Sequence, residues 1–304
     1  MSEKTGFAAV LADIDAATDE PRLHDALAGA RETAVDALLA HTSALALADG
    51  WSDVMRHAVA VAARVVTLAA VPWTWFVSGS VGRGEAIPGS DVKTLIALDD
   101  SMNHDGKSTA MVLAADVHAL LKRCGLNPDP NGVLASRGRF CRRRSNWSDG
   151  IERWCTEPAE DRGVVMTGVL SDCVPVADPA DGLRSQTLDA TGRHPQALRA
   201  MLQDATAVRA GIPSRLRVFA THVDTVDVKA AAVEPVVKIA RWAAMSARSD
   251  SVSTLERLDH AAVAGTLEAD DAATLRDCYT ALSHIRWRHR AGGWINGDRV
   301  TGGY

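Results

Sequence analysis

The sequence predicts a small mixed α/β core with a helical region on either side of it along the chain. Apolar residues recur every three or four positions up to about residue 70, and the same spacing returns beyond residue 181. Between these regions stand short runs rich in aromatic and β-branched residues, which are typical of buried strands. We therefore expect three divisions: a helical region at 1–70, the core at 71–182, and a second helical region at 183–304.

Three segments in the first half of the chain have the spacing of helices with one apolar face. The first lies between residues 21 and 47, the second runs from Trp51 to Leu68, and the third from Lys107 to Cys124. The first two should fill the N-terminal region, and the third should belong to the core.

Three short runs are the strand candidates of the core. Trp73 to Ser78 (WTWFVS) is aromatic and β-branched, and glycines follow it at once, which indicates a buried strand that ends in a tight turn. Thr94 to Leu98 (TLIAL) is the second candidate, and the apolar run Gly163 to Leu170 (GVVMTGVL) is the third. Together they predict a small sheet.

The last third of the chain contains two expected helices. Ser253 and Glu256 have the spacing of a capping box, in which the serine side chain caps the helix and the glutamate reaches back. This helix should end near Gly265, and the next should run from Glu268 to about Arg290. The glycine-rich segment 292–304 (GGWINGDRVTGGY) is expected to be loose.

Composition excludes several classes of protein. With 304 residues, 47% hydrophobic and 23% charged, the chain resembles ordinary globular proteins and not disordered ones. The net charge of −5 disfavours a dedicated nucleic-acid binder. Five scattered cysteines without a CxxC pair indicate neither a disulfide framework nor a structural zinc site. No stretch is apolar enough for a signal peptide or a membrane span, so we expect a cytoplasmic protein without a membrane partner.

The segment from Val77 to Lys93 (VSGSVGRGEAIPGSDVK) is the one with chemical character. It is not a P-loop, because no GK[ST] follows its glycines, and it does not match GxGxxG. The alternative without a ligand is a glycine-rich hairpin turn. The spacing of Ser90-Asp91 after this turn favours a binding function instead.

These residues resemble the signature of the nucleotidyltransferase superfamily that includes DNA polymerase β. The closest likeness is to the PII uridylyltransferase-like branch, whose pattern is GS-x-x-R-x-E, a short gap, and then S/T-D-x-D. Here the pattern is carried by Gly79-Ser80, Arg83, Glu85, Ser90 and Asp91. The resemblance implies an α/β nucleotidyltransferase core flanked by N-terminal helices and a C-terminal helical bundle.

Later segments are similar to the same branch in the same order. They are Val133 to Ser136 with Trp147 and Trp154, then Asp172, then Asp227 to Lys229, Arg241, Thr254 to Leu258, and Arg286 to His289. The resemblance identifies the last four of these with a helical substrate-binding domain. It covers roughly residues 30 to 290.

The resemblance implies a reaction in which a nucleoside monophosphate passes from a triphosphate to a hydroxyl group. In such a site a Gly-Ser turn lets backbone amides approach the phosphates without a side-chain clash. Paired carboxylates on one face of a strand can hold two magnesium or manganese ions. The implied assignments are Gly79, Ser80, Arg83, Lys93, Lys229 and Arg241 for the nucleotide, Asp91 and Asp172 for metal and catalysis, and Glu85 and Ser90 as braces.

Lys93 is a departure from this pattern, because it stands where the family has the second carboxylate of D-x-D. Side chains alternate along a strand, so Lys93 should project beside Asp91. At ~4 Å and an effective dielectric constant of ~20, one unit-charge interaction is worth about 4 kcal/mol. An ammonium at this place should therefore weaken binding of the catalytic metal strongly. The alternatives are that Asp91 alone holds the nucleotide-associated metal, or that Lys93 binds a phosphate directly.

Each of the other candidates has a plain structural alternative. Arg83 either contacts phosphate or pairs with Glu85 to brace the turn. Asp91 and Asp172 could be ordinary residues at the ends of strands, and Lys229 and Arg241 could be charges on exposed helices. For the tryptophans at 147 and 154 a helix core is favoured over a base-stacking platform, and for the arginines at 142–144 a solvated basic turn.

Two functions of different classes follow. The first is a metal-dependent nucleotidyltransferase that acts on a hydroxyl of a protein or a small molecule, with Mg²⁺ or Mn²⁺ and a nucleoside triphosphate. The second is a catalytically impaired nucleotide-binding protein that regulates or organises a separate signalling partner, and Lys93 favours it. A nucleotidyltransferase of the toxin–antitoxin or resistance type is a third reading, but such proteins usually lack the later helical signatures.

Overall fold

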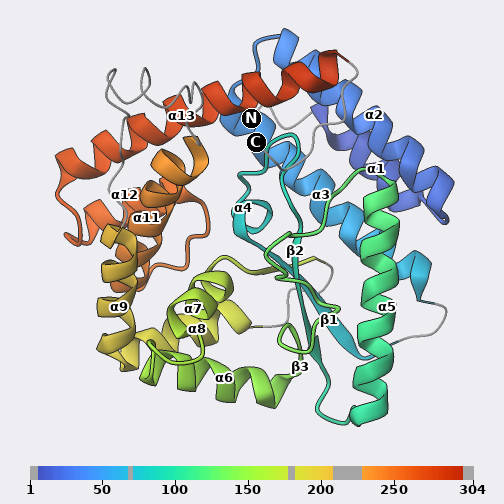
Figure 1. The fold of residues 1–304 in the computed structure, drawn as a ribbon. Helices are drawn as coiled ribbons and strands as arrows, with labels where there is room; N and C mark the ends of the chain where they lie inside the picture. The colour runs from blue at the N-terminus through green and yellow to red at the C-terminus, as the bar shows by residue number, and fades with distance from the viewer. Residues whose placement is uncertain (1–5, 68–70, 177–181, 208–227, 297–304) are drawn as a thin grey trace, which may run out of the picture. The chain divides into compact units, whose positions relative to one another are not determined.

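The computed structural model describes residues 6–67, 71–176, 182–207 and 228–296 (Figure 1). The chain divides into two compact units. Unit 1 comprises Met1–Ile151, Asp172–Gln186 and His284–Gly303, and unit 2 comprises Glu152–Ser171 and Thr187–Ser283. The N-terminal helices and the sheet thus share one unit. The three divisions expected from the sequence remain a prediction.

Three helices form the N-terminal part of unit 1: α1 (Ala8–Ala16), α2 (Glu20–Leu39) and α3 (Ala44–Val66). The sequence pattern treated residues 21–47 as one helical stretch, and this was wrong. The chain leaves α2 after Leu39, and the side chain of Ser43 then accepts a hydrogen bond of 3.2 Å from the backbone N–H of Ala46. A serine in this position begins a new helix, because its oxygen satisfies an amide that has no partner within the helix.

The sheet is small and mixed, as the sequence predicted. Its strands are β1 (Trp73–Ser78), β2 (Lys93–Leu98), β3 (Cys141–Arg143) and β4 (Val174–Pro175), in the order β3-β2-β1-β4. β1 pairs antiparallel with β2 and with β4, and β2 pairs parallel with β3. The first two strands lie within a residue of their predicted bounds. The arginines at 142 and 143 belong to β3, so the solvated basic turn expected there was wrong.

The core of unit 1 lies between this sheet and the helices α3 and α5 (His104–Arg123), as Figure 1 shows. Trp75 and Val77 of β1 and Ile96 and Leu98 of β2 belong to the same hydrophobic cluster as residues of both helices. Five successive residues of each of these two strands are buried. Such continuous burial means that both faces of the sheet are covered, which explains why the strand sequences are apolar without alternation.

The segment 163–170, expected as a strand, is helical: α7 spans Gly163–Ser171. Its buried residues recur at helical spacing and are Gly163, Met166, Thr167, Leu170 and Ser171. A short apolar run cannot by itself distinguish a buried helix from a strand. The spacing three, four and seven residues after Gly163 was the signal that would have identified the helix.

The remaining elements are helical. They are α6 (Arg144–Thr156), α8 (Leu183–Arg193), α9 (Pro195–Ala207), the π-helix η2 (Lys229–Val233), α11 (Glu234–Ser246), α12 (Thr254–Val263) and α13 (Ala269–Ile295). The helices expected from Thr254 and Glu268 are thus confirmed. Within the described ranges, none of the helices is both long and apolar enough to cross a membrane.

The segment 292–295, expected to be loose, is the last turn of α13. The ring of Trp294 lies 4.8 Å from that of Trp51 on α3 and 6.2 Å from that of Trp287, measured between ring centroids. Aromatic packing of this kind outweighs the poor helix propensity of the two preceding glycines. The other residues of the glycine-rich segment, 297–304, lie outside the described residues.

Replacing Ser253 with alanine is expected to lower the free energy of unfolding by about 1 kcal/mol, because it removes the cap of α12. The Oγ of Ser253 accepts a 3.3 Å hydrogen bond from the backbone N–H of Glu256, as the capping box predicted. Urea denaturation measures the change. Ser108→Ala, on the exposed face of α5, is the control and should change stability little. Equal effects of the two substitutions would contradict the role of the cap.

Candidate functional site

The site begins where β1 turns into the short helix α4 (Gly79–Gly82). Ser78 is extended, and Gly79 then adopts a left-handed backbone with φ +68°. A Cβ at Gly79 would lie 3.1 Å from Cδ and 3.2 Å from Cε of Lys93. The backbone angle therefore favours glycine, and a Cβ would also crowd the lysine chain that covers the turn.

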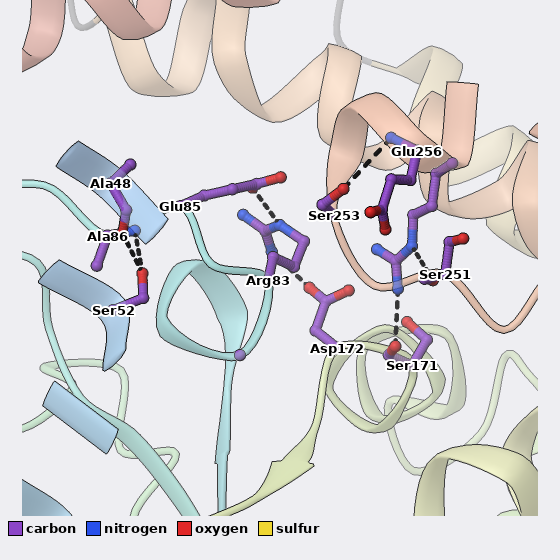
Figure 2. Close-up of polar contacts among 12 residues, drawn as sticks. Ala48, Ser52, Arg83, Glu85, Ala86, Ser171, Asp172, Ser251, Ser253 and Glu256 are labelled. Atoms are coloured by element: carbon purple, nitrogen blue, oxygen red, sulfur yellow. Dashed lines mark hydrogen bonds and ion pairs between the residues drawn. The ribbon is translucent and has the colours of Figure 1, made fainter. Parts of the chain in front are cut away.

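The loop after the turn is fastened to helix α3. Arg56 donates from Nε to the carbonyl oxygen of Val81 at 3.1 Å and from a terminal nitrogen to that of Gly82 at 2.9 Å. Ser52, completely buried, accepts a 2.9 Å hydrogen bond from the backbone N–H of Ala86, as Figure 2 shows. The loop thus has a fixed conformation that does not depend on a ligand.

Arg83 lies between two carboxylates. Its Nε donates to Oε2 of Glu85 at 2.6 Å, and its Nη1 donates to Oδ2 of Asp172 at 2.5 Å (Figure 2). The side chains are 10%, 8% and 2% exposed, respectively. Of the two roles that the sequence left open for Arg83, the geometry therefore favours the brace.

Asp172 was expected at the end of a strand, and this was wrong. It stands between the end of α7 and β4, and that misplacement follows from the wrong strand at 163–170. Its carboxylate binds Arg83, and its backbone oxygen packs against Gly82. Asp172 thus links the N-terminal end of β4 to the loop after β1.

Replacing Gly82 with alanine is expected to destabilise the protein by about 1–3 kcal/mol, because the added methyl group overpacks this contact. A Cβ at Gly82 would lie 2.0 Å from the backbone oxygen of Asp172. Gly29→Ala in α2 is the matched control: its Cβ would meet nothing within 4 Å, and it should stabilise the helix slightly. Thermal unfolding measures both. A neutral Gly82→Ala would mean that the two segments do not pack as described.

Lys93 binds Asp129. The ammonium donates to Oδ1 of this aspartate, whose side chain is only 1% exposed, whereas that of Lys93 is 29% exposed. The other carboxylate oxygen of Asp129 accepts a 2.9 Å hydrogen bond from the backbone N–H of Val133. A buried carboxylate is costly unless it is paired and hydrogen-bonded, and Asp129 has both kinds of partner.

Asp129 is the residue of this site that sequence reasoning missed. It lies in the run Asn127-Pro-Asp-Pro-Asn-Gly132, which is typical of an exposed turn. The signal that could have found it was Lys93 itself, since a cation at the start of a buried strand requires an anionic partner. The segment 133–136, noted for its family likeness, runs beside the same strand: the backbone N–H of Thr94 donates to the oxygen of Val133 at 3.1 Å.

Asp91 and Lys93 flank the buried Val92 and are both partly exposed, in keeping with alternation along a strand. Ser90 accepts a 2.9 Å hydrogen bond at Oγ from the backbone N–H of Ile87 and so stabilises the turn before Asp91. The backbone oxygen of Ser80 accepts from Glu85 N–H at 2.8 Å. These contacts fix two local turns within the motif.

Two of the carboxylates at the site are paired with cations. No group of three or more histidine, cysteine, aspartate or glutamate side chains in the described part of the chain is arranged to hold a metal ion. Asp172 is engaged by Arg83, and Asp129 by Lys93. The place of the second carboxylate of D-x-D holds an ammonium, so the residues present do not fit the pair of divalent ions that the superfamily resemblance implies.

The remaining nucleotide candidates lie in unit 2. Lys229 is the exposed first residue of η2. Arg241 lies on α11, and its Nη1 would be 3.4 Å from a Cβ at Gly168 of α7. The part of both residues in nucleotide binding stays a prediction.

The two tryptophans of α6 are core residues. Trp147 and Trp154 are 0% and 1% exposed. The indole N–H of Trp147 donates to the oxygen of Ile96 at 2.9 Å, and that of Trp154 to Oδ2 of Asp161 at 3.0 Å. Neither ring offers a face on which a base could stack.

Comparison with known protein families gives two matches. The model "Putative nucleotidyltransferase DUF294" matches residues 24–161, and "Putative nucleotidyltransferase substrate binding domain" matches residues 195–302. Together they span most of the chain and cover all the site residues except Asp172. A search of curated proteins finds no match.

Proposed function

Because the chain belongs to the DUF294 family of nucleotidyltransferases with a helical substrate-binding domain, we propose that it binds a nucleoside triphosphate at the β1–α4 turn and the start of β2. We further propose that nucleotidyl transfer by this chain is impaired, and that its role is regulatory. The observation that carries the second statement is the ion pair between Lys93 and Asp129.

Nucleotide binding is supported by the shape and rigidity of the turn. Gly79 brings no Cβ to the turn, and Arg56 and Ser52 fix the loop from α3. A backbone that is already ordered can present its N–H groups to phosphate oxygens without an entropic cost of ordering. Ser80, partly exposed at this turn, adds a hydroxyl.

Impaired transfer follows from charge. Divalent metal ions in such sites hold the attacking and leaving oxygens, and carboxylates hold the metal ions. With Lys93 beside Asp91, the second carboxylate is replaced by an ammonium whose charge is offset by Asp129, so an incoming cation meets a weaker attraction than at two carboxylates. Because the ammonium is fixed by the buried Asp129, it cannot swing away without leaving that carboxylate unpaired.

An active transferase is the second candidate, and one observation favours it. The chain retains the family's substrate-binding domain at residues 195–302, which a protein that only binds nucleotide does not require. In this case a nucleoside monophosphate would pass to a hydroxyl of a protein or a small molecule. The helical domain would bind that acceptor.

The test compares the protein with the double variant Lys93→Asp, Asp129→Asn. The second substitution is needed because an aspartate at 93 would otherwise face a buried carboxylate. Calorimetry measures binding of ATP and of UTP in the presence of Mg²⁺ or Mn²⁺, with Lys122→Met on the exposed face of α5 as control. We expect the double variant to bind at least about tenfold more tightly, a change of ~1.4 kcal/mol.

Two outcomes would contradict the proposal. If neither protein binds either nucleotide, the nucleotide site is wrong. If the unaltered protein releases pyrophosphate from ATP or UTP at a rate that Lys93→Asp, Asp129→Asn does not increase, transfer is not impaired and the second candidate is correct.

A further inference from the structure

We propose that Lys93 and Asp129 form a built-in cation that takes the place of a divalent metal, so that this chain binds the triphosphate of a nucleotide without metal. The inference rests on the proposed function, since it concerns the same nucleotide site. It assigns to Lys93 the role of phosphate ligand and to Asp129 that of a positioning residue.

The backbone places Lys93 at the phosphate-binding turn. In the β1–β2 ladder Lys93 pairs with Ser78, the residue immediately before Gly79. Its aliphatic chain then runs over Gly79, so the lysine passes across the turn instead of pointing along the strand. The position of the ammonium is therefore set by the ladder and by packing on the glycine.

Asp129 holds the ammonium as a carboxylate ligand holds a metal ion. One oxygen accepts from Lys93 and the other from the N–H of Val133, and the aspartate N–H donates to the oxygen of Val92 at 3.1 Å. The carboxylate is thereby fixed to the beginning of β2. The carboxylate therefore cannot move together with the lysine side chain to another position.

The pair leaves the ammonium available to a ligand. An ammonium carries three N–H donors, and the contact with Asp129 uses one of them. Burial is uneven, because the carboxylate side chain is 1% exposed and the lysine side chain 29%. The charges of Lys93 and Asp129 balance, and the exposed member of the pair is the cation.

A metal-bound triphosphate gains little at such a site. Its Mg²⁺ would be repelled by Lys93, whereas the free triphosphate presents oxygens that accept the ammonium's remaining hydrogens. The structure therefore predicts a nucleotide affinity that does not fall when the metal is removed. This is opposite to the behaviour of a site built from two aspartates.

The experiment measures ATP binding by calorimetry in EDTA and in Mg²⁺. We expect the unaltered protein to bind ATP in EDTA at least as tightly as in Mg²⁺. The neutral double variant Lys93→Met, Asp129→Asn should bind ATP in EDTA about tenfold more weakly. Lys122→Met, which also removes one positive charge, should bind like the unaltered protein. Circular dichroism checks that each variant is folded.

A second variant separates position from charge. Lys93→Arg keeps the cation and should retain metal-free binding within a few-fold. Asp129→Asn alone frees the ammonium from its anchor and should make the ratio of the affinities in EDTA and in Mg²⁺ fall. A role of Asp129 in folding alone would leave this ratio unchanged and would overturn the assignment of a positioning residue.

The results distinguish this inference from the proposed function. Binding that requires Mg²⁺, or binding in EDTA that Lys93→Met, Asp129→Asn leaves unchanged, overturns the built-in cation while nucleotide binding stands. Absence of ATP binding by every protein in both buffers overturns the two together.

Discussion

Replacing Arg83 with methionine is expected to lower the free energy of unfolding by about 3–5 kcal/mol, the cost of removing one partner from a buried ion pair. The guanidinium bridges Glu85 and Asp172, whose side chains are 8% and 2% exposed. Without it, two carboxylates remain close together in a poorly solvated place. The links from β1 to Glu85 and to the beginning of β4 would be lost at the same time.

Urea denaturation gives the size of this effect, and two further variants define its origin. Arg22→Met removes an exposed arginine whose partner, Asp19, lies 3.9 Å away, and should change stability by no more than about 1 kcal/mol. Adding Asp172→Asn to Arg83→Met should recover part of the loss, because it removes one of the two carboxylate charges that Arg83 bridges. If Arg83→Met is no more harmful than Arg22→Met, the buried bridge contributes nothing and the account of the brace fails.

Acidification from pH 6.5 to pH 4 is expected to destabilise the protein by about 3 kcal/mol through His118 alone, as a pKa difference of one unit corresponds to 1.36 kcal/mol. Burial lowers the pKa of His118 from 6.5 to about 4. The imidazole is 7% exposed and pairs through Nε2 with Oγ1 of Thr94 at 2.8 Å. It lies under the sheet, with its ring 6.2 Å from that of Trp75.

The sign follows from the order in which the two states take up the proton. As the pH falls below 6.5 the unfolded chain protonates His118 first, whereas the folded protein keeps the ring neutral until about pH 4. The stabilisation is therefore complete above pH 6.5 and is lost on the way down to pH 4. Below that value this residue contributes no further change.

His118→Gln isolates this contribution, because glutamine can still pair with Thr94 but does not titrate. We expect the free energy of unfolding of the variant, measured in urea at several pH values, to decline less steeply between pH 6.5 and pH 4 than that of the unaltered protein. His104→Gln, which replaces an exposed histidine, is the matched control. Parallel pH profiles for His118→Gln and the unaltered protein would contradict the burial argument.

The sequence predicted best those parts of the fold in which local pattern and tertiary environment agree. The strands at 73–78 and 93–98 are apolar because they are covered on both faces, and the turn after the first is marked by its glycines. Helix α12 was found from its cap. In each case the residues that determine the element lie within or next to it.

Where partners come from distant segments, the sequence could not show them. Helix α7 was mistaken for a strand because short apolar runs suit both structures when buried. The helical end of α13 depends on the contact of Trp294 with Trp51, about 240 residues away in sequence.

The sequence predicted the motif residues of the candidate site but not the ion pairs that they form. Gly79, Arg83 and Lys93 were identified from local spacing, and the departure at Lys93 was visible in the sequence alone. Its partner Asp129 lies 36 residues further along the chain. Asp172 pairs with Arg83 across 89 residues. Residues so far apart in sequence form an ion pair only when the chain folds, so no short sequence motif reveals the pair.

The register pair between Ser78 and Lys93 closes the whole motif into a loop whose two ends are already joined. For a free segment, bringing the ends together costs entropy that grows with the logarithm of its length. Here the pairing of β1 with β2 brings the two ends of the motif together when the protein folds. The two ends of the motif therefore keep their positions, but a lysine in place of a carboxylate at residue 93 also requires an anionic partner, which Asp129 provides.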